Sequence, residues 1–257
     1  MELQALLFDV DGTLADTERD GHRVAFNRAF AEAGLDWHWS VALYGELLAV
    51  TGGKERIRRY LDHHRPDVVL PADADGYIAE LHAAKTRHYT ELLAEGAIPL
   101  RPGVERLLRE ARDVGLRLGI ATTTTPENVT ALITHTLGET ALDWFEVIAA
   151  GDVVPEKKPA PDIYEYALER LGLPAAAALA VEDSELGLQS ARAAGLVTIV
   201  TVNDYTRDHD FPGAAAVLAD LGEPERGTVE APSGQAQPAV DVNRLRDWHA
   251  RSLSESG

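Results

Sequence analysis

The stretch LLFDVDGTLADTE, from Leu6 to Glu18, places two aspartates directly behind an apolar run. The run QALLF is predicted to be a buried strand, so Asp9 and Asp11 follow its carboxyl end. In an open parallel sheet, ligands bind outside the carboxyl ends of the strands. A lone pair of aspartates more often marks a turn or a helix cap. Whether Asp9 and Asp11 belong to a functional site therefore depends on which residues follow the other predicted strands.

Four further runs rich in Val, Ile and Leu are predicted to be strands, with helices between them. The runs are LRLGIA, FEVIAA, ALAVE and LVTIVTV, and helices are expected at Val104–Val114, Glu127–Leu137, Pro161–Leu171 and Leu186–Ala194. This alternation indicates an α/β fold, a doubly wound parallel sheet with helices on both faces. The predicted core consists of residues 1–15 and 97–222.

Residues 16–96 break the alternation, because they show helical periods and no convincing strand. A segment of roughly 80 residues is too long for a loop and predicts an inserted, all-helical cap domain. Residues 223–257 are rich in Gly, Pro, Glu, Ser and Gln. They are expected to be a flexible linker and C-terminal tail, in which a short amphipathic helix at about Val242–Leu253 is possible.

Composition narrows the class of partner. The chain has 257 residues, 45% of them hydrophobic, which is enough for one large core or a core and a smaller domain. A formal net charge of −18 argues against nucleic acid as a partner. There is no cysteine, and no apolar run is long enough for a membrane span or a signal peptide. We expect a monomeric cytoplasmic protein that acts on a small molecule.

A second pair of carboxylates follows another predicted strand. Glu182 and Asp183 come directly after ALAV, as Asp9 and Asp11 follow QALLF. Four carboxylates that converge on one small volume repel one another by several kcal/mol unless a cation is bound. Oxygen ligands of this kind suit Mg²⁺, which often binds together with a substrate phosphate. The pattern therefore predicts a Mg²⁺ and phosphate site.

Two other segments offer groups that bind phosphate. Thr122 follows the strand in LGIATTTTPEN, and Thr123 and Thr124 extend a run of hydroxyls before a helix. Lys158, in EKKPAPDIY, precedes the next helix and can bind phosphate as a point charge. Taken singly, such threonines are mostly helix caps and such lysines are mostly solvated. The order of these segments along the chain, and the predicted strand end before most of them, favour a phosphate-binding site.

Four segments resemble the motifs of the haloacid dehalogenase-like hydrolase superfamily. They are DVDGTL, ATTTT, KKPAPD and VEDSELG, in the family's order and over residues 1 to about 220. The helical insertion matches the subclass whose cap follows the first motif. DTERDGHRVAFN, ATTTTPENV and EKKPAPDIY are most similar to the CbbY-type branch. That resemblance implies hydrolysis of xylulose 1,5-bisphosphate to xylulose 5-phosphate and phosphate.

The resemblance also implies a role for each motif residue. Asp9 is the expected nucleophile, which forms an aspartyl-phosphate, and Asp11 is the expected general acid and base. Thr122 and Lys158 are expected to hold the phosphoryl group. The expected Mg²⁺ ligands are Asp9, the backbone carbonyl of Asp11, Asp183 and Glu182.

The cap is expected to select the substrate. Glu18 and His22 follow the first linker, although one extra residue separates His22 from DTE compared with related caps. TGGKE does not fit a nucleotide-binding P-loop, because Glu55 stands where Ser or Thr is needed. Lys54 could instead bind a second phosphate. Arg56, Lys85 and His88 are further candidates, or solvated positions on helix faces.

Related activities remain as alternatives. The aspartate at position 11 argues against a dehalogenase, which lacks it, and against a phosphonatase, which has a small residue there. A phosphate shift as in beta-phosphoglucomutase, or hydrolysis of phosphoglycolate, would use the same motifs. A catalytically silent binding or regulatory protein on this fold is a further alternative, because a fold does not guarantee chemistry.

Overall fold

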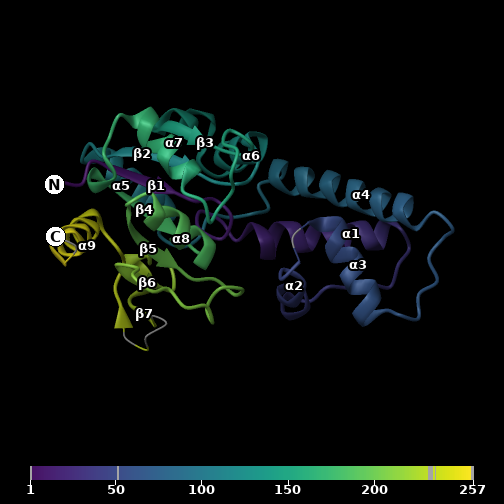
Figure 1. Ribbon diagram of the computed structural model, residues 1–257. Coiled ribbons are helices and arrows are strands. Elements are labelled where there is room, and N and C mark those ends of the chain that lie inside the picture. The colour runs from purple at the N-terminus through teal and green to yellow at the C-terminus, as the bar shows by residue number, and fades with distance from the viewer. Residues whose placement is uncertain (1, 51, 231–233, 235, 256–257) are drawn as a thin grey trace. The chain divides into compact units, whose positions relative to one another are not determined.

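The chain forms two compact units, seen in Figure 1 as a sheet-containing part and a helical part. The computed structural model describes residues 2–50, 52–230, 234 and 236–255. Unit 1 combines Met1–Asp16 with Pro99–Gly257, and unit 2 is Thr17–Ile98. Unit 2 is therefore an insertion in the sequence of unit 1, directly after the first strand and the loop that follows it.

A six-stranded sheet forms the centre of unit 1, and its strands all run parallel. Their order is β3-β2-β1-β4-β5-β6. The strands are β1 (Ala5–Phe8), β2 (Arg117–Ala121), β3 (Phe145–Ala149), β4 (Ala178–Glu182), β5 (Val197–Thr201) and β6 (Ala216–Leu218). The chain builds outward from β1 in one direction and then returns to the other side of β1 with β4. The point where the order reverses lies between β1 and β4, where such sheets bind ligands.

Helices connect the strands and cover the sheet, which confirms the predicted doubly wound α/β fold. The helices of unit 1 are α5 (Val104–Asp113), α6 (Pro126–Leu137), α7 (Asp162–Leu171), α8 (Glu185–Ala193) and α9 (Val242–Glu255). Ala5 and Leu7 of β1 and Ala178 and Ala180 of β4 pack in one buried cluster with α7 and α8. The three alanines among them let the helices lie close to the two central strands.

Strand β6 is absent from the sequence prediction. Its three residues lie in the run GAAAVLAD, which has neither the alternation nor the β-branched content typical of a strand. Pairing with β5 stabilises this strand although its sequence has low strand propensity. Ile199 pairs with Ala216, and Thr201 pairs with Leu218.

Every element in the described part of unit 2 is helical, as predicted for the insertion. A π-helix covers Thr17–His22, followed by α1 (Arg23–Glu32), α2 (Val41–Leu47), α3 (Gly53–His64) and α4 (Ala74–Ala94). The core is aromatic: the ring of Trp39 lies 4.6 Å from Phe26, 4.9 Å from Phe30 and 5.5 Å from Tyr60. Packing of this kind lets a small domain bury much apolar area with few residues.

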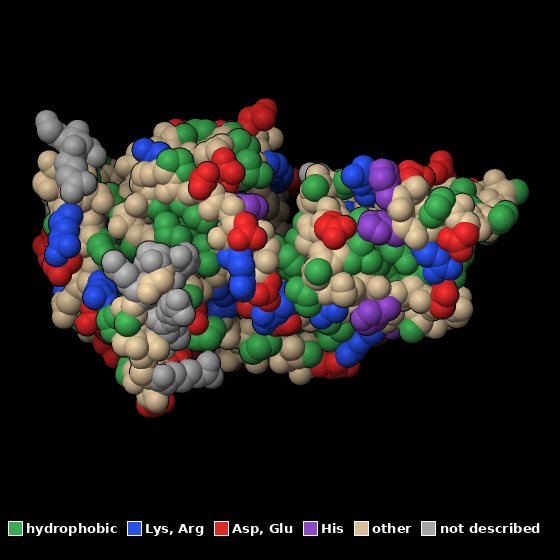
Figure 2. Space-filling model, turned by 90° about the horizontal axis from the view of Figure 1, so that it is seen from below, with side chains coloured by type: hydrophobic (Ala, Val, Ile, Leu, Met, Phe, Trp, Pro, Cys, Tyr) green, Lys and Arg blue, Asp and Glu red, His purple; other side chains and the backbone are tan. Residues whose placement is uncertain are grey.

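The surface carries both acidic and basic side chains, as expected from a chain with 42 acidic and 24 basic residues. On the face shown in Figure 2, acidic and basic side chains are interspersed. Among the described helices, none combines the length and the apolar composition that a bilayer span requires.

Composition predicts a flexible linker and tail after residue 222, and described residues of this segment contact the rest of unit 1. Helix α9 follows a short hairpin of β7 (Val229–Glu230) and β8 (Ala236–Gln237). Val242, Leu245 and His249 are buried on one side of α9. The Arg106 guanidinium donates to the carbonyls of Leu221, Gly222 and Val240, and the Val242 N–H donates to Glu110. These contacts hold the start of α9 against α5.

Leu245→Ala should lower the free energy of unfolding by about 2–4 kcal/mol, because Leu245 is fully buried and its removal leaves a cavity. Leu253→Ala, on the same helix but partly exposed, should cost under about 1 kcal/mol. Urea unfolding followed by circular dichroism measures both. Equal, near-zero effects of the two variants would show that α9 is not docked.

Candidate active site

Three carboxylates meet where β1 and β4 end side by side. Phe8 of β1 pairs with Val181 of β4, so Asp9 and Glu182 are the next residues on adjacent strands. Asp9, Glu182 and Asp183 each offer an oxygen, and these oxygens lie within 4.8 Å of one another. All three side chains are buried. Strand register thus brings together three of the four carboxylates that the sequence places at this point, and Asp11 is not among the three.

Two glycines leave room for the carboxylates. A Cβ atom on Gly12 would lie 2.2 Å from Oδ2 of Asp183, and a Cβ atom on Gly187 would lie 1.9 Å from Oε2 of Glu182. Gly12 also has a φ of +85°, which other residues rarely adopt. The carboxylates therefore pack directly against backbone, and any larger residue at positions 12 or 187 would displace them.

The ammonium of Lys158 lies between two of the acids. Its Nζ is 2.7 Å from Oδ1 of Asp9 and 2.6 Å from Oε1 of Glu182, and it donates to the Ala121 carbonyl at 3.0 Å. Burial alone would lower the pKa of Lys158, but attraction to Asp9 and Glu182 outweighs it and raises the pKa above its ordinary value. Lys158 is therefore a fixed positive charge at neutral pH.

One ammonium does not balance the acids. Burial raises the pKa of Asp183 well above its ordinary value, and the charges of Asp9 and Glu182 raise it further. Burial likewise raises the pKa of Glu182, and the opposing pull of Lys158 does not offset it. Two unit charges at 4 Å repel by about 4 kcal/mol at an effective dielectric constant of 20. Hard oxygen ligands with excess negative charge fit a divalent cation.

Thr122 lies at the end of the next strand. It follows β2, is buried, and its N–H donates to the Ala149 carbonyl at 2.9 Å. Its neighbour Ala121 accepts a hydrogen bond from Lys158, which places this strand end beside the acids. Thr123 is exposed, and Thr124 accepts a hydrogen bond from the Asn128 amide at 3.2 Å.

Asp11 is half-buried in the loop that follows β1. The N–H groups of Thr13, Leu14 and Ala15 all point to the Val10 carbonyl, and the Gly12 N–H donates to Ala15 at 2.7 Å. The loop is thus a tight turn that begins one residue after Asp9.

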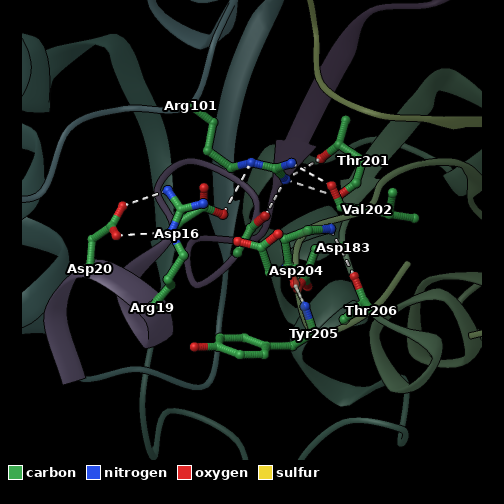
Figure 3. A network of polar contacts seen from close by, with 12 residues as sticks. Asp16, Arg19, Asp20, Arg101, Asp183, Thr201, Val202, Asp204, Tyr205 and Thr206 are labelled. Carbon is green, nitrogen blue, oxygen red and sulfur yellow. Dashed lines mark hydrogen bonds and ion pairs between the residues drawn. The ribbon is translucent and has the colours of Figure 1, made fainter. Parts of the chain in front are cut away.

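Sequence reasoning missed two side chains that support this site. The Asn203 amide Nδ2 donates to Oδ2 of Asp183 at 2.7 Å, and Asn203 lies two residues past β5, where the strand-end rule could have found it. Arg101 donates to the Gly12 carbonyl and to the ends of β5 and β6 (Figure 3). Its sequence context, a Pro-Gly turn before a helix, gives no sign of this.

Unit 2 holds a polar cluster of its own. The Tyr44 hydroxyl donates to Oε2 of Glu18 at 2.5 Å, and Arg56 lies 3.7 Å from the same oxygen. Nδ1 of His22 is 2.8 Å from Nζ of Lys85, and the His22 ring stacks on Tyr89. Lys85 is buried, so its interpretation as a solvated position on a helix face was wrong.

Burial and neighbouring groups together set the charges in this cluster. Burial lowers the pKa of His22 to about 3, and the charges of Lys85 and Arg56 add to the effect, so His22 is neutral near pH 7. Burial would raise the pKa of Glu18, but His22, Arg56 and the Tyr44 hydroxyl together lower it. Since His22 is neutral near pH 7, Arg56 and Tyr44 are the groups that stabilise the Glu18 carboxylate there.

The π-helix at Thr17–His22 can accommodate the residue by which this chain exceeds related caps between DTE and His22. A π-helical turn holds about one residue more than an α-helical turn. We infer that the π-helical turn accommodates this extra residue, so that Glu18 and His22 lie in one cluster.

Lys54 is exposed near the start of α3, and no described contact joins it to Glu18 or His22. His88 pairs instead with Glu32 and Glu91.

Comparison with known proteins identifies the family. Residues 3–195 match the model of the haloacid dehalogenase-like hydrolases. The chain belongs to this hydrolase family. It is 48% identical to CbbY of Cupriavidus necator over 99% of this chain and all of that one, and 55% identical to CbbY of Rhodobacter capsulatus over 86% and 95%.

Solved structures agree with this placement. A crystal structure of CbbY from Rhodobacter sphaeroides with phosphate has a TM-score of 0.70 and 50% identity, covering 85% of this chain and 94% of that chain. A mutant of that protein, in complex with xylulose-(1,5)bisphosphate, has a TM-score of 0.71 over 86% and 96% of the chains. This haloacid dehalogenase-like hydrolase is thus of the CbbY type, and it is a phosphatase.

Asp183→Asn should stabilise the protein in the presence of EDTA. A carboxyl whose pKa is raised on folding binds protons more readily in the folded state, so the free energy of unfolding falls as pH rises above the ordinary pKa. Removing that charge should add about 1 kcal/mol or more at about pH 8, and less at a lower pH of about 5, because the raised pKa favours the protonated, uncharged form of Asp183 as pH falls.

Asp208→Asn is the matched control, because Asp208 is exposed and should change stability little at either pH. Thermal unfolding at the two pH values measures the difference. If Asp183→Asn instead destabilised the protein at pH 8 as much as at pH 5, the charge crowding at this site would be disproved.

Proposed function

We propose that the chain is a Mg²⁺-dependent phosphatase that converts xylulose 1,5-bisphosphate and water to xylulose 5-phosphate and phosphate, through an aspartyl-phosphate. The observation that carries this proposal is Asp9, held by the Lys158 ammonium beside Glu182 and Asp183 at the switch point of the sheet. A carboxylate fixed there, next to an acidic cluster and Thr122, has the surroundings that a nucleophile in phosphoryl transfer needs.

The substrate is inferred from similarity. The CbbY mutant crystallised with xylulose-(1,5)bisphosphate is 50% identical to this chain, over 86% of this chain and 96% of the mutant. A relative at 30% identity is a phosphoglycolate phosphatase from Rhodobacter capsulatus, so smaller phosphates belong among the substrates tested. A net charge of −18 argues against nucleic acid as a partner, since that binding needs clustered Lys and Arg. We propose that the enzyme acts as a cytoplasmic monomer without membrane or nucleic-acid partners.

The proposed reaction has two steps. An oxygen of Asp9 attacks the phosphorus, the bond from phosphorus to the sugar oxygen breaks, and Asp11 donates its proton to that oxygen. Asp11, now a carboxylate, takes a proton from the water that attacks the aspartyl-phosphate, which releases phosphate and restores Asp9. An alkoxide is a poor leaving group, so a positioned acid contributes typically ~10²–10⁴ in rate.

The other groups hold the phosphoryl and the sugar. Lys158 and the Thr122 hydroxyl bind the phosphoryl oxygens. Thr123 and Thr124, which follow Thr122 in the sequence, contribute to substrate binding. Mg²⁺, held by Asp9, the Asp11 carbonyl, Asp183 and Glu182 directly or through water, would supply the positive charge that stabilises the transferring group.

We propose that three residues of unit 2 bind the remainder of the substrate. Glu18 is kept ionised by Arg56 and Tyr44 and can accept hydrogen bonds from sugar hydroxyls. His22 is neutral, and because its Nδ1 faces the Lys85 ammonium, its Nε2 carries the proton and can donate. Lys54, exposed and cationic, would bind the second phosphate.

A substrate panel tests the activity. With Mg²⁺ present, phosphate release should be fastest from xylulose 1,5-bisphosphate and slower from ribulose 1,5-bisphosphate, beta-glucose 1-phosphate and phosphoglycolate. Lys54→Met should raise KM for the bisphosphate more than for phosphoglycolate, which has no second phosphate to lose contact with. Preference for phosphoglycolate would overturn the substrate, and isomerised sugar phosphate without net phosphate release would indicate a mutase.

Substitution of the two aspartates tests the mechanism. Asp9→Asn should abolish Mg²⁺-dependent phosphate release, because an amide cannot attack phosphorus. Asp11→Asn should lower kcat by ~10²–10⁴ while Mg²⁺ binding, followed by calorimetry, is largely kept. Unchanged turnover in Asp9→Asn would exclude Asp9 as the nucleophile, and unchanged turnover in Asp11→Asn would exclude the proton transfers assigned to Asp11.

A further inference from the structure

Arg101 is a buried arginine to which the proposed reaction assigns no role. It lies at the start of the second segment of unit 1, and only 6% of its side chain is exposed. Figure 3 shows its guanidinium directed at Thr201 and Val202, with Asp16 on its other side. Its acceptors are the carbonyls of Gly12, Thr201, Val202 and Ala219 and the Thr201 hydroxyl. Its Nε also forms an ion pair with Oδ1 of Asp16, at 3.3 Å.

One of these acceptors belongs to the loop that carries Asp11. The N–H groups of this loop donate within the loop, from Gly12 to Ala15 and from Thr13 and Leu14 to Val10. The Gly12 carbonyl instead accepts from Nη1 of Arg101, which also donates to the Thr201 carbonyl at 2.9 Å. The guanidinium therefore ties the turn after Asp11 to the end of β5.

The backbone of Arg101 supports the same loop from the other side. Its N–H donates to the Leu14 carbonyl at 2.8 Å, and the neighbouring Leu100 forms an antiparallel bridge with Ala15. The two chain segments that lead to and from unit 2 are thus paired within unit 1, directly beside the guanidinium.

A second connection reaches the acidic cluster. Nη2 of Arg101 donates to the Val202 carbonyl, and the next residue, Asn203, donates its amide to Oδ2 of Asp183. A Cβ atom on Gly12 would lie 2.6 Å from Nδ2 of Asn203, so the Asp11 loop and the Asn203 segment touch. One side chain therefore fixes both the loop of the proposed acid and the support of a proposed metal ligand.

We propose that Arg101 is a positioning residue for phosphoryl transfer, which holds the Asp11 loop at the distance from the reacting phosphate that proton donation requires. This inference rests on the proposed function. A guanidinium suits the task, because its planar fork presents five N–H donors to acceptors on several elements. A lysine keeps the charge but has three donors on one nitrogen, so it cannot bridge the Gly12, Val202 and Ala219 carbonyls together.

Leaving-group dependence separates positioning from general damage. A sugar alkoxide needs a proton as it leaves, whereas p-nitrophenolate leaves without one, and kcat/KM reports only the steps up to the first irreversible transfer. Arg101→Lys should lower kcat/KM for xylulose 1,5-bisphosphate, or for whichever panel member the wild type hydrolyses fastest, by ~10². For p-nitrophenyl phosphate the loss should be roughly tenfold smaller.

Two further variants calibrate this result. Asp11→Asn should show the same selectivity in a stronger form. Arg106→Lys is the matched control, because Arg106 also donates to three backbone carbonyls, at Leu221, Gly222 and Val240, but reaches neither the Asp11 loop nor Asn203 in the described contacts. Any loss of kcat/KM in Arg106→Lys should be equal for the sugar phosphate and for p-nitrophenyl phosphate.

Equal losses for both substrates in Arg101→Lys, with selective losses in Asp11→Asn, would overturn the role of Arg101 and leave the proposed function standing. An Asp11→Asn variant without selectivity would instead refute the acid role of Asp11, and the Arg101 proposal with it. If Arg101→Lys does not fold, Thr201→Val carries the test, because it removes the hydroxyl 3.1 Å from Nη1 with little change in volume. It should give a smaller effect with the same selectivity, and equal losses would again overturn the proposal.

Discussion

The contact of the Lys158 ammonium with Asp9 and Glu182, at 2.7 and 2.6 Å, is the interaction on which the rest of the site depends. The sheet brings buried carboxylates together at one point, and without a cation their repulsion would cost several kcal/mol, a large share of the roughly 5–15 kcal/mol that stabilises a typical domain. Lys158 offsets part of this repulsion and remains charged because of it. The negative charge that is left, at Asp183 above all, makes the same point suitable for a divalent metal and a phosphate.

Backbone geometry makes this crowding possible. Gly12 and Gly187 let the carboxylates of Asp183 and Glu182 lie against bare main chain. Asn203 orients Asp183 through one hydrogen bond, and Arg101 fixes the segment before Asn203. The reacting groups are thus held by polar contacts to loops that follow strands, while the strands themselves are fixed by apolar packing. This separation lets the loops carry chemistry on a rigid sheet.

The sequence predicted the fold and three members of the acidic cluster, because both depend on local pattern, but it also placed Asp11 there, which is not one of the clustered acids. Strand ends identify Asp9, Glu182, Asp183 and Thr122, parallel pairing brings these strand ends side by side, and the loop before α7 adds Lys158. What the sequence could not show depends on long-range contacts. Arg101 acts across 100 residues on Thr201.

Long-range contacts decide two points that the sequence alone did not settle. The Gly and Pro content after residue 222 suggested a flexible linker and tail, but among the described residues Leu245 is buried and Arg106 donates to the Val240 carbonyl. Lys85 could have been a binding candidate or a solvated position, and it is buried with its ammonium 2.8 Å from His22, 63 residues away in the sequence. In both cases the deciding partner was distant in sequence, where neither periodicity nor composition carries information.

The most direct test of the aspartyl-phosphate route is chemical trapping of the intermediate. Enzyme in turnover with xylulose 1,5-bisphosphate and Mg²⁺ is quenched in acid, reduced with borohydride and digested, and the peptides are analysed by mass spectrometry. Reduction of an acyl phosphate at position 9 converts Asp9 to homoserine, and this is the predicted result, absent when substrate is left out. Rapid phosphate release with an unmodified Asp9 peptide, or with modification at another residue, would contradict the assignment of Asp9 as the nucleophile.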